Sequence, residues 1–290
     1  MQESASTVWV FPALFLLSGF TFQLLERWWP LRRFETRRAV ALDVLALFWA
    51  ALLTVGFAAW ITPLLRGMPE LTPLQAIRSA VRGLDLPPIA MAAIAIVVVD
   101  FCNYWGHRLL HTKLLWPAHA FHHSTTNMYW VAGVRESPVH YFVVTLPAAF
   151  VGAMFPPEST GAWLLAILVG PILNQHFIHS NVRTNLGAFG AIFVTPRHHF
   201  VHHARDRAWS NSNFGFIFSV WDRWFGTHTD PVLVPDDFPL GLDYPVEPTR
   251  LFLGISPSPT ASSSATVLPA MTPPAMAHRG DQSPSRSSFS

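Results

Sequence analysis

Long apolar stretches separated by short polar ones fill the first part of the chain and predict membrane-spanning helices. Residues 8–25 carry no charged side chain, residues 39–62 carry only Asp43, and residues 86–105 carry only Asp100. A helix of about 20 apolar residues crosses the hydrocarbon core of a bilayer, which is about 30 Å thick. Each of the three stretches is therefore long enough to cross a membrane once.

Two further apolar stretches predict a helical hairpin. They cover residues 138–156 and 161–178, and the sequence Pro156-Pro157-Glu158 between them predicts a tight bend. We expect this hairpin to cross the membrane or to be deeply embedded in it, and we expect about four transmembrane helices in an all-α fold. The mixed residues 63–85 predict a loop with one short interfacial helix.

The distribution of arginine predicts the orientation of these helices. Residues 26–38 hold five arginines, and loops rich in lysine and arginine stay on the cytoplasmic side. The following helices then deliver His107 to the cytoplasmic face, and the hairpin returns His179 to the same face. We therefore expect a multi-pass integral membrane protein with a cytoplasm-facing helical cap that contains the active site.

The composition agrees with a membrane protein and argues against several other classes. Charged residues make up 12% of the chain, about half of the share in ordinary globular proteins. The net charge is +2 and no basic cluster is interleaved with aromatic residues, so nucleic acid is not an expected partner. Cys102 is the single cysteine, so neither a disulfide framework within the chain nor a thiolate metal cluster is expected.

Histidine carries the candidate chemistry of the chain. Twelve of the fourteen histidines lie between His107 and His203, and eleven of these fall into three groups. The groups are His107, His111, His119, His122 and His123; then His176 and His179; then His198, His199, His202 and His203.

The spacing of these histidines predicts metal binding, because residues three and four apart share one face of a helix. His107 and His111 are four apart, and the motif H-x-x-H-H occurs twice, ending at His123 and at His203. Each triplet is expected to aim two or three imidazoles at one point. Eight ligands are too many for a single ion, so two ions are the simplest count.

The surrounding residues indicate which metal is bound. Neutral imidazole binds iron, zinc, copper and nickel. A zinc protease motif, H-E-x-x-H, would need a glutamate where this chain has Arg108. Saturated lipid chains offer no polar group, and attack on them requires oxygen activated by iron or copper. We therefore favour a redox-active pair of irons at the membrane surface.

Asp100 is a second candidate residue, because a carboxylate deep in an apolar helix is costly and usually functional. It is expected to orient a ligand imidazole, and the alternative is an ion pair with Arg108. For Asp222 and Arg223, the alternative to a role in the site is that they only cap a helix or pair with other surface charges.

The ordered motifs resemble those of the fatty acid hydroxylase / sterol desaturase superfamily of integral-membrane di-iron oxygenases. The superfamily pattern is an aspartate before H-R-x-x-H, then H-x-x-H-H, Q-x-x-x-H-x-N, P-x-x-H-x-x-H-H and a closing N-x-G with W-D-x-x-F-G-T. The matching residues are Asp100, His107, Arg108, His111, His119, His122, His123, Gln175, His179, Asn181, Pro196, His199, His202, His203, Asn213, Gly215, Trp221, Asp222, Phe225, Gly226 and Thr227. The resemblance covers roughly residues 90–230.

The resemblance implies two iron ions, O2 as co-substrate and an external electron donor or reductase, since no flavin, haem or cytochrome motif is visible. The metal ligands that it implies are His107, His111, His119, His122, His123, His179, His199, His202 and His203. The residues expected to contact and orient these ligands without binding the metal themselves are Asp100, Arg108, Gln175, Asn181, Asn213 and Asp222.

Five further histidines have no matched position, and of these His278 lies in the predicted tail and is not expected to take part in the site. His140 stands where the superfamily has an acidic residue, and we favour a pocket position over a ligand. For His176, which precedes His179 by three residues, the sequence favours neither a ligand nor a non-ligand position. His198 is expected behind the ligands, and His228 is expected at the surface rather than in the site.

These observations predict an enzyme that hydroxylates or desaturates a fatty acyl, sterol-like or related lipid. We divide the chain into membrane anchor helices and a loop (1–85), a catalytic domain (86–230), a C-terminal extension (231–256) and a disordered tail (257–290). The competing interpretations are an ether-lipid or carotenoid oxygenase of the same superfamily, a zinc-dependent membrane hydrolase, and a non-enzymatic metal-binding membrane protein.

Overall fold

The described part of the chain is built from helices. The computed structural model describes residues 4–34, 39–67, 72–154, 165–166, 168–184 and 186–255. These residues contain no β-strand and form only three isolated β-bridges. The predicted helical class is therefore confirmed for them. The predicted tail, 257–290, and the predicted bend after residue 155 lie outside the described residues.

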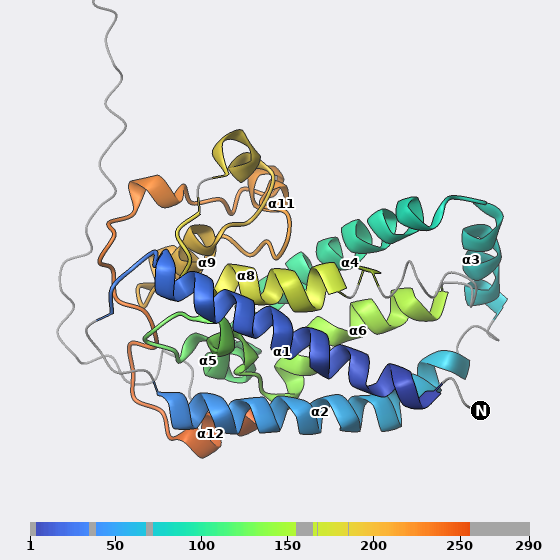
Figure 1. The fold of residues 1–290 in the computed structure, drawn as a ribbon, viewed down its shortest axis with the longest axis horizontal. Helices are drawn as coiled ribbons and strands as arrows, with labels where there is room; N and C mark the ends of the chain where they lie inside the picture. Colours follow the sequence, from blue (N-terminus) through green and yellow to red (C-terminus); the bar gives the residue numbers. More distant parts are fainter. Residues whose placement is uncertain are drawn as a thin grey trace, which may run out of the picture. The chain divides into compact units, whose positions relative to one another are not determined.

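Four long helices correspond to the apolar stretches. They are α1 (Ser4–Trp28), α2 (Val40–Gly67), α4 (Pro88–Leu110) and α6 (Pro138–Met154). Figure 1 shows them lying lengthwise across the view, with α1 and α4 tilted in opposite senses, and α6 packs against both α2 and α4. The short helix expected within residues 63–85 is α3 (Thr72–Gly83), which precedes α4.

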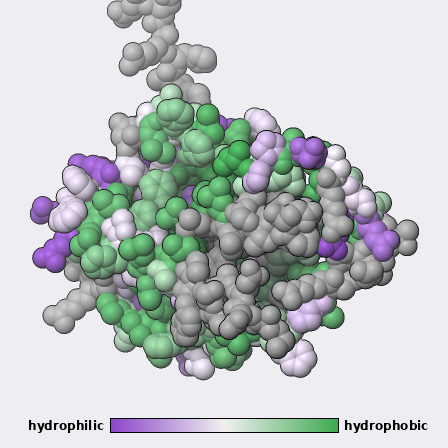
Figure 2. All heavy atoms as spheres, turned by 45° about the vertical axis from the view of Figure 1, so that its right-hand side comes forward, coloured by the Kyte–Doolittle hydropathy of each residue, from purple (hydrophilic) through white to green (hydrophobic). Residues whose placement is uncertain are grey.

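Two of the described helices are long and apolar enough to cross a membrane, namely Val40–Leu65 within α2 and Pro88–Leu110. The α6 helix is apolar but shorter. Large side chains of α2 are exposed, such as Trp60 at 77%, and hydrophobic residues cover much of the face in Figure 2. The number of spans and their orientation stay predictions, and the predicted stretch 161–178 is only partly described.

The first histidine motif stands at the end of the long helix α4, and the helices that carry the other motifs are short. They are α5 (Trp116–His123), α8 (Gln175–His179) and α9 (Pro196–His202), and they lie toward the left of Figure 1. Proline occupies the first turn of both α5 and α9, where its missing N–H group leaves no helical hydrogen bond unmade. The Thr195 hydroxyl also accepts a bond from the backbone N–H of His198, which caps the start of α9.

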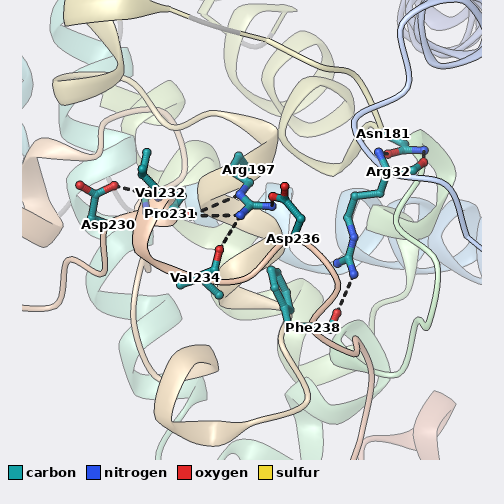
Figure 3. Close-up of polar contacts among 9 residues, drawn as sticks. All are labelled: Arg32, Asn181, Arg197, Asp230, Pro231, Val232, Val234, Asp236 and Phe238. Atoms are coloured by element: carbon teal, nitrogen blue, oxygen red, sulfur yellow. Dashed lines mark hydrogen bonds and ion pairs between the residues drawn. The ribbon is translucent and has the colours of Figure 1, made fainter. Parts of the chain in front are cut away.

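The segment after residue 230 packs back against α9. The buried apolar residues of this contact are Met128, Phe200, Val201, Ala204, Val234, Phe238 and Leu240. Arg197 of α9 donates to the Val234 carbonyl and lies 2.6 Å from Asp236, and Arg32 donates to the Phe238 carbonyl (Figure 3). The 3₁₀ helix η6 (Pro231–Leu233) and α12 (Pro248–Leu253) belong to this segment, and α12 packs on α5.

A buried ion pair joins α2 to the segment before α6. The Nε atom of Arg135 lies 2.5 Å from Oδ1 of Asp43, and both side chains are almost completely buried. The Tyr129 hydroxyl donates to Oδ2 of Asp43, and Arg135 also donates to the Ser124 hydroxyl directly after α5. Arg135 and Tyr129 therefore compensate the carboxylate that interrupts the apolar sequence of α2.

We predict that Arg135→Leu destabilises the fold by about 3–5 kcal/mol, because it leaves Asp43 buried without a counter-charge. Thermal or denaturant unfolding in detergent measures the change. The double variant Asp43→Leu/Arg135→Leu is the matched control and should recover much of the loss, since it removes both charges. An Arg135→Leu protein as stable as the wild type would contradict this account.

Candidate metal centre

Nine histidines converge from four helices and form two groups in the described residues. The first group consists of His107, His111, His119, His123 and His202, and the second of His122, His179, His199 and His203. Within each group, one ring nitrogen of every histidine lies within 4.8 Å of the others. The structure thus brings together all nine histidines that the motifs singled out. Their role as metal ligands stays a prediction.

Each H-x-x-H-H triplet is divided between the two groups, which differs from the expectation that a triplet aims at one point. On α5, His119 and His123 join the first group and His122 joins the second. On α9 the relation is reversed, because His202 joins the first group and the other two join the second. The helical rotation of about 100° per residue explains the split. Position i+4 points about 40° to one side of position i and position i+3 about 60° to the other side, so i+3 diverges most from i+4.

The distances between ring nitrogens fit metal binding. The Nε2 atom of His119 lies 3.1 Å from Nε2 of both His107 and His123, and Nε2 of His199 lies 2.9 Å from that of His179. Two nitrogens that each bind one ion at about 2.1 Å lie about 3 Å apart when the angle at the ion is near 90°. The imidazoles are therefore spaced as ligands of shared ions would be.

The protonation state of these imidazoles also suits a metal. Burial is the main cause that lowers the pKa of seven of the nine grouped histidines well below the usual value of a histidine. This applies to His111, His119, His122, His123, His199, His202 and His203. They are therefore neutral at pH 7, and neutral imidazole is the form that binds metals.

Backbone carbonyls fix the orientation of three of these rings. The Nδ1 atoms of His107, His202 and His179 lie 2.8–2.9 Å from the carbonyl oxygens of Phe214, Ser212 and Gln175. A carbonyl can only accept, so Nδ1 carries the proton and Nε2 is left with a free electron pair. The carbonyl therefore selects the tautomer that can bind a metal through Nε2.

Two of these carbonyls flank Asn213, one of the residues expected behind the ligands. Asn213 has a left-handed backbone (φ 56°), a conformation that asparagine tolerates better than most residues. Its side chain exchanges hydrogen bonds with both the N–H and the carbonyl of Thr229. Asn213 therefore shapes the turn that presents the Ser212 and Phe214 carbonyls to His202 and His107.

Asp222 holds the other side of this turn. Its carboxylate accepts from the backbone N–H groups of Phe214 and Gly215 at 2.8 Å, and from the Thr227 hydroxyl at 2.7 Å. Burial raises the pKa of Asp222 to about 6, so the carboxylate is still mostly ionised at pH 7. Asp222 reaches His107 through Phe214, which donates to Asp222 and accepts from the imidazole.

We predict that Asp222→Ala weakens metal retention in the first group by about 10–100-fold, the usual cost of removing a residue that orients a ligand. The two buried N–H groups of Phe214 and Gly215 lose their acceptor, at about 1–3 kcal/mol each. Metal content after a chelator wash and unfolding in detergent measure the two effects. Asp237→Ala, at an exposed position, is the control. Unchanged metal retention in Asp222→Ala would remove Asp222 from this role.

Asp100 differs from both expectations for it, because its carboxylate contacts neither a ligand imidazole nor Arg108. It accepts from the backbone N–H groups of Ile217 and Phe218 and from Nε1 of Trp221. The turn of residues 212–222 offers these buried donors to it directly. Arg108 instead donates to the Tyr104 hydroxyl and lies over the ring of Trp105. Asp100 thus holds the same turn as Asp222, one step further from the histidines.

Gln175 and Asn181 have different surroundings. Gln175 accepts from His179 through its backbone and donates through its side chain to the carbonyl of Gly133 at 2.8 Å. Asn181 instead binds the backbone N–H and carbonyl of Arg32, after α1 (Figure 3). Gln175 therefore holds His179 directly, whereas Asn181 joins the segment after α1 to the end of α8.

Sequence reasoning missed Gly133, which lies in the 3₁₀ helix η2 (Trp130–Val134). A methyl group there would lie 2.7 Å from Cγ and Nδ1 of His179. The only sequence signal was a small residue in the run W-V-A-G-V. The Ser212 and Phe214 carbonyls were equally invisible, because any residue type supplies a carbonyl.

The four unmatched histidines that the structure describes lie outside both groups, and His278 lies outside the described residues. His140 is buried with its ring 4.6 Å from that of His119 and 4.9 Å from that of His122, so it faces one member of each group. His176 lies against Phe15 and binds the Ser18 hydroxyl through Nδ1. His198 and His228 face each other, with ring centres 5.7 Å apart.

Comparisons with known proteins agree with this geometry. Residues 92–227 match the family described as fatty acid hydroxylase. The chain is 33% identical to human alkylglycerol monooxygenase over 134 residues, 46% of this chain and 29% of that protein. It is 34% identical to the ornithine lipid hydroxylase OlsE of Rhizobium tropici over 151 residues, 50% of this chain and 44% of that protein.

A third relative is named as a desaturase and not as a hydroxylase or monooxygenase. The chain is 27% identical to the Delta(7)-sterol 5(6)-desaturase ERG3A of Gibberella zeae over 141 residues, 47% of this chain and 37% of that protein. The chain thus spans less than half of the length of each of these three relatives. No solved structure matches the chain.

Proposed function

We propose that this chain is a membrane-bound oxidoreductase of the fatty acid hydroxylase / sterol desaturase superfamily, because residues 92–227 match the fatty acid hydroxylase family and its relatives include lipid hydroxylases and a sterol desaturase. It uses O2 to hydroxylate or desaturate a lipid. Two iron ions are the proposed cofactors, and an external reductase or electron carrier supplies the electrons.

The observation that carries this proposal is the division of nine imidazoles into two groups without a carboxylate. Each group offers at least four ring nitrogens and, among the described residues, consists of histidines alone. Asp100 and Asp222 accept backbone N–H bonds instead. A zinc hydrolase would need a carboxylate as general base beside the metal. The described residues of the two groups do not supply one.

Iron bound at the two groups would supply the O2-dependent oxidation of an unactivated C–H bond. The chain's own contribution is to hold and isolate that chemistry. The Phe214, Ser212 and Gln175 carbonyls keep three imidazoles in the binding tautomer. Burial of the remaining histidines excludes water from the ligands.

The proposed topology has about four spans, with the catalytic domain of residues 86–230 on the cytoplasmic side. The arginines of residues 26–38 support this orientation. The ends of α4 and α8 that carry His107 and His179 lie in the same cap. A lipid entering from the bilayer would reach the site where the helices leave the membrane.

An ether lipid is the second candidate substrate, within the same reaction class. The match to alkylglycerol monooxygenase, a relative named for that substrate, favours it. The match to an ornithine lipid hydroxylase keeps other lipids in the test. A panel of alkylglycerol, ornithine lipid and sterol separates these candidates by product formation.

The proposal is tested by purification of the full chain under anaerobic conditions with ferrous iron. We expect two irons per chain, and O2 consumption when a chemical reductant and extracted lipid are added. Mass spectrometry should find a lipid product with one added oxygen or one lost pair of hydrogens. Turnover that needs zinc but no O2, or a single metal per chain, would contradict the proposal. Lipid profiles of cells with and without the gene would then identify the substrate.

A further inference from the structure

A second hydrophobic surface lies outside the long helices. It consists of Phe189, Ile192 and Phe193, in or directly after the 3₁₀ helix η5 (Gly187–Ala191), and of Trp224 and Phe225, at the end of α11 (Val220–Trp224). We call it the aromatic patch. Trp224 is 70% exposed and Phe189 is 64% exposed. Residues 184–196 contain no charged side chain.

The two halves of the aromatic patch are fastened to each other. The rings of Phe193 and Phe218 lie 5.5 Å apart, and the N–H of Ser219 donates to the carbonyl of Ile192. Nε of Arg223 donates to the carbonyl of Ala191. These contacts make the patch one surface and not two mobile loops that happen to expose apolar residues.

The patch continues the exposed apolar side of α4. The ring of Phe225 lies 5.0 Å from that of Trp105, and Phe101 lies 5.1 Å from Trp221. The exposed large residues of this side recur every three or four positions along α4. They are Ile94, Val98, Phe101, Trp105 and Leu109. Because α4 is one of the two helices suited to cross a membrane, the patch is a sideways extension of a lipid-facing surface.

We propose that the aromatic patch lies in the interface of the lipid bilayer and forms a membrane contact separate from the spanning helices. Tryptophan prefers this depth because its ring has an apolar body and a polar N–H. The charged residues of α11 fit the same position. Arg223 is exposed, where it can meet lipid phosphates, whereas Asp222 is buried and fully hydrogen-bonded.

This contact would fix the level of the metal centre relative to the bilayer. The patch borders the turn of residues 212–222, which Asp100 and Asp222 hold and which presents carbonyls to His107 and His202. Lipid contact on its outer side would therefore brace the turn. The inference does not depend on the proposed reaction, because it uses only exposed residues and their packing on α4.

Site-directed fluorescence tests the inference in the full chain reconstituted in nanodiscs. Cys102, exposed on α4, is labelled in the wild type as the lipid-contacting reference. In a Cys102→Ser background, Phe189→Cys and Trp224→Cys carry the same probe. Val232→Cys is the matched control, because Val232 is 86% exposed and its backbone N–H donates to the carboxylate of the exposed Asp230 (Figure 3).

We expect nitroxide-labelled lipid to quench the probes at residues 189 and 224 as strongly as at Cys102, and iodide in water to quench only the probe at residue 232. Iodide quenching at 189 and 224 equal to that at 232 would overturn the proposal. Protection from both quenchers would also overturn it and would indicate a covering protein, such as a second copy of the chain. If Trp224→Cys fails to fold, Trp224→Phe replaces it. That variant should lose fluorescence that brominated lipid quenches in the wild type.

Discussion

Replacing His203 with alanine should leave the protein inserted in the membrane, reduce its metal content from two ions per chain to one, and abolish lipid oxidation. His203 belongs to the second group, where its Nε2 atom lies 3.1 Å from that of His199. Removing a residue that only orients a ligand already costs about 10–100-fold in metal affinity or activity, so loss of a ligand should cost at least as much. Metal analysis after a chelator wash and product formation measure the two effects.

Double variants test whether the histidines are divided as the structure places them. His122 and His203 lie on different helices but in one group, so His122→Ala/His203→Ala should still retain one ion. His122 and His123 are neighbours in sequence but belong to different groups. His122→Ala/His123→Ala should therefore weaken both sites. Equal metal loss in the two double variants would contradict the division, and His228→Ala, outside both groups, should keep two ions.

The apolar pattern was sufficient to predict the helices that position this centre. The stretches 39–62 and 86–105 correspond to α2 and α4. An apolar run of that length can satisfy its backbone N–H and C=O groups in lipid only by forming a helix. The pattern could not predict how Asp43 is accommodated. Its partner Arg135 is 92 positions away, and only the tertiary fold brings the two together.

The identity of the site residues was easier to predict than their arrangement. Histidine at i, i+3 and i+4 indicates a metal, but the spacing alone does not show that the i+3 member joins a different group of histidines. Asp100 shows the same limit. Its cost in an apolar helix marked it as important, yet the donors that satisfy it, at Ile217, Phe218 and Trp221, come from a turn more than 100 residues away.

Substituting Gly133 by alanine should weaken the second group without removing any ligand. The added methyl group would lie 2.7 Å from the His179 ring and 2.8 Å from Nε2 of Gln175, so one of these must move. His179 cannot move without lengthening either its 2.9 Å bond to the Gln175 carbonyl or its approach to His199. We expect a metal loss of about 10–100-fold in affinity at the second group, with the first group intact.

Gly56→Ala is the matched control, because a methyl group at Gly56 of α2 would meet nothing within 4 Å. The same change of side chain at that position should leave both ions bound, so a loss restricted to Gly133→Ala reports crowding at His179. The structure also predicts a rescue. In the double variant Gly133→Ala/Gln175→Ala, one of the two neighbours that the methyl group meets is gone, while the backbone carbonyl that holds His179 remains. This double variant should therefore bind metal at the second group more tightly than Gly133→Ala alone. If Gly133→Ala retains both ions after a chelator wash, the close contact between η2 and His179 does not control the second group.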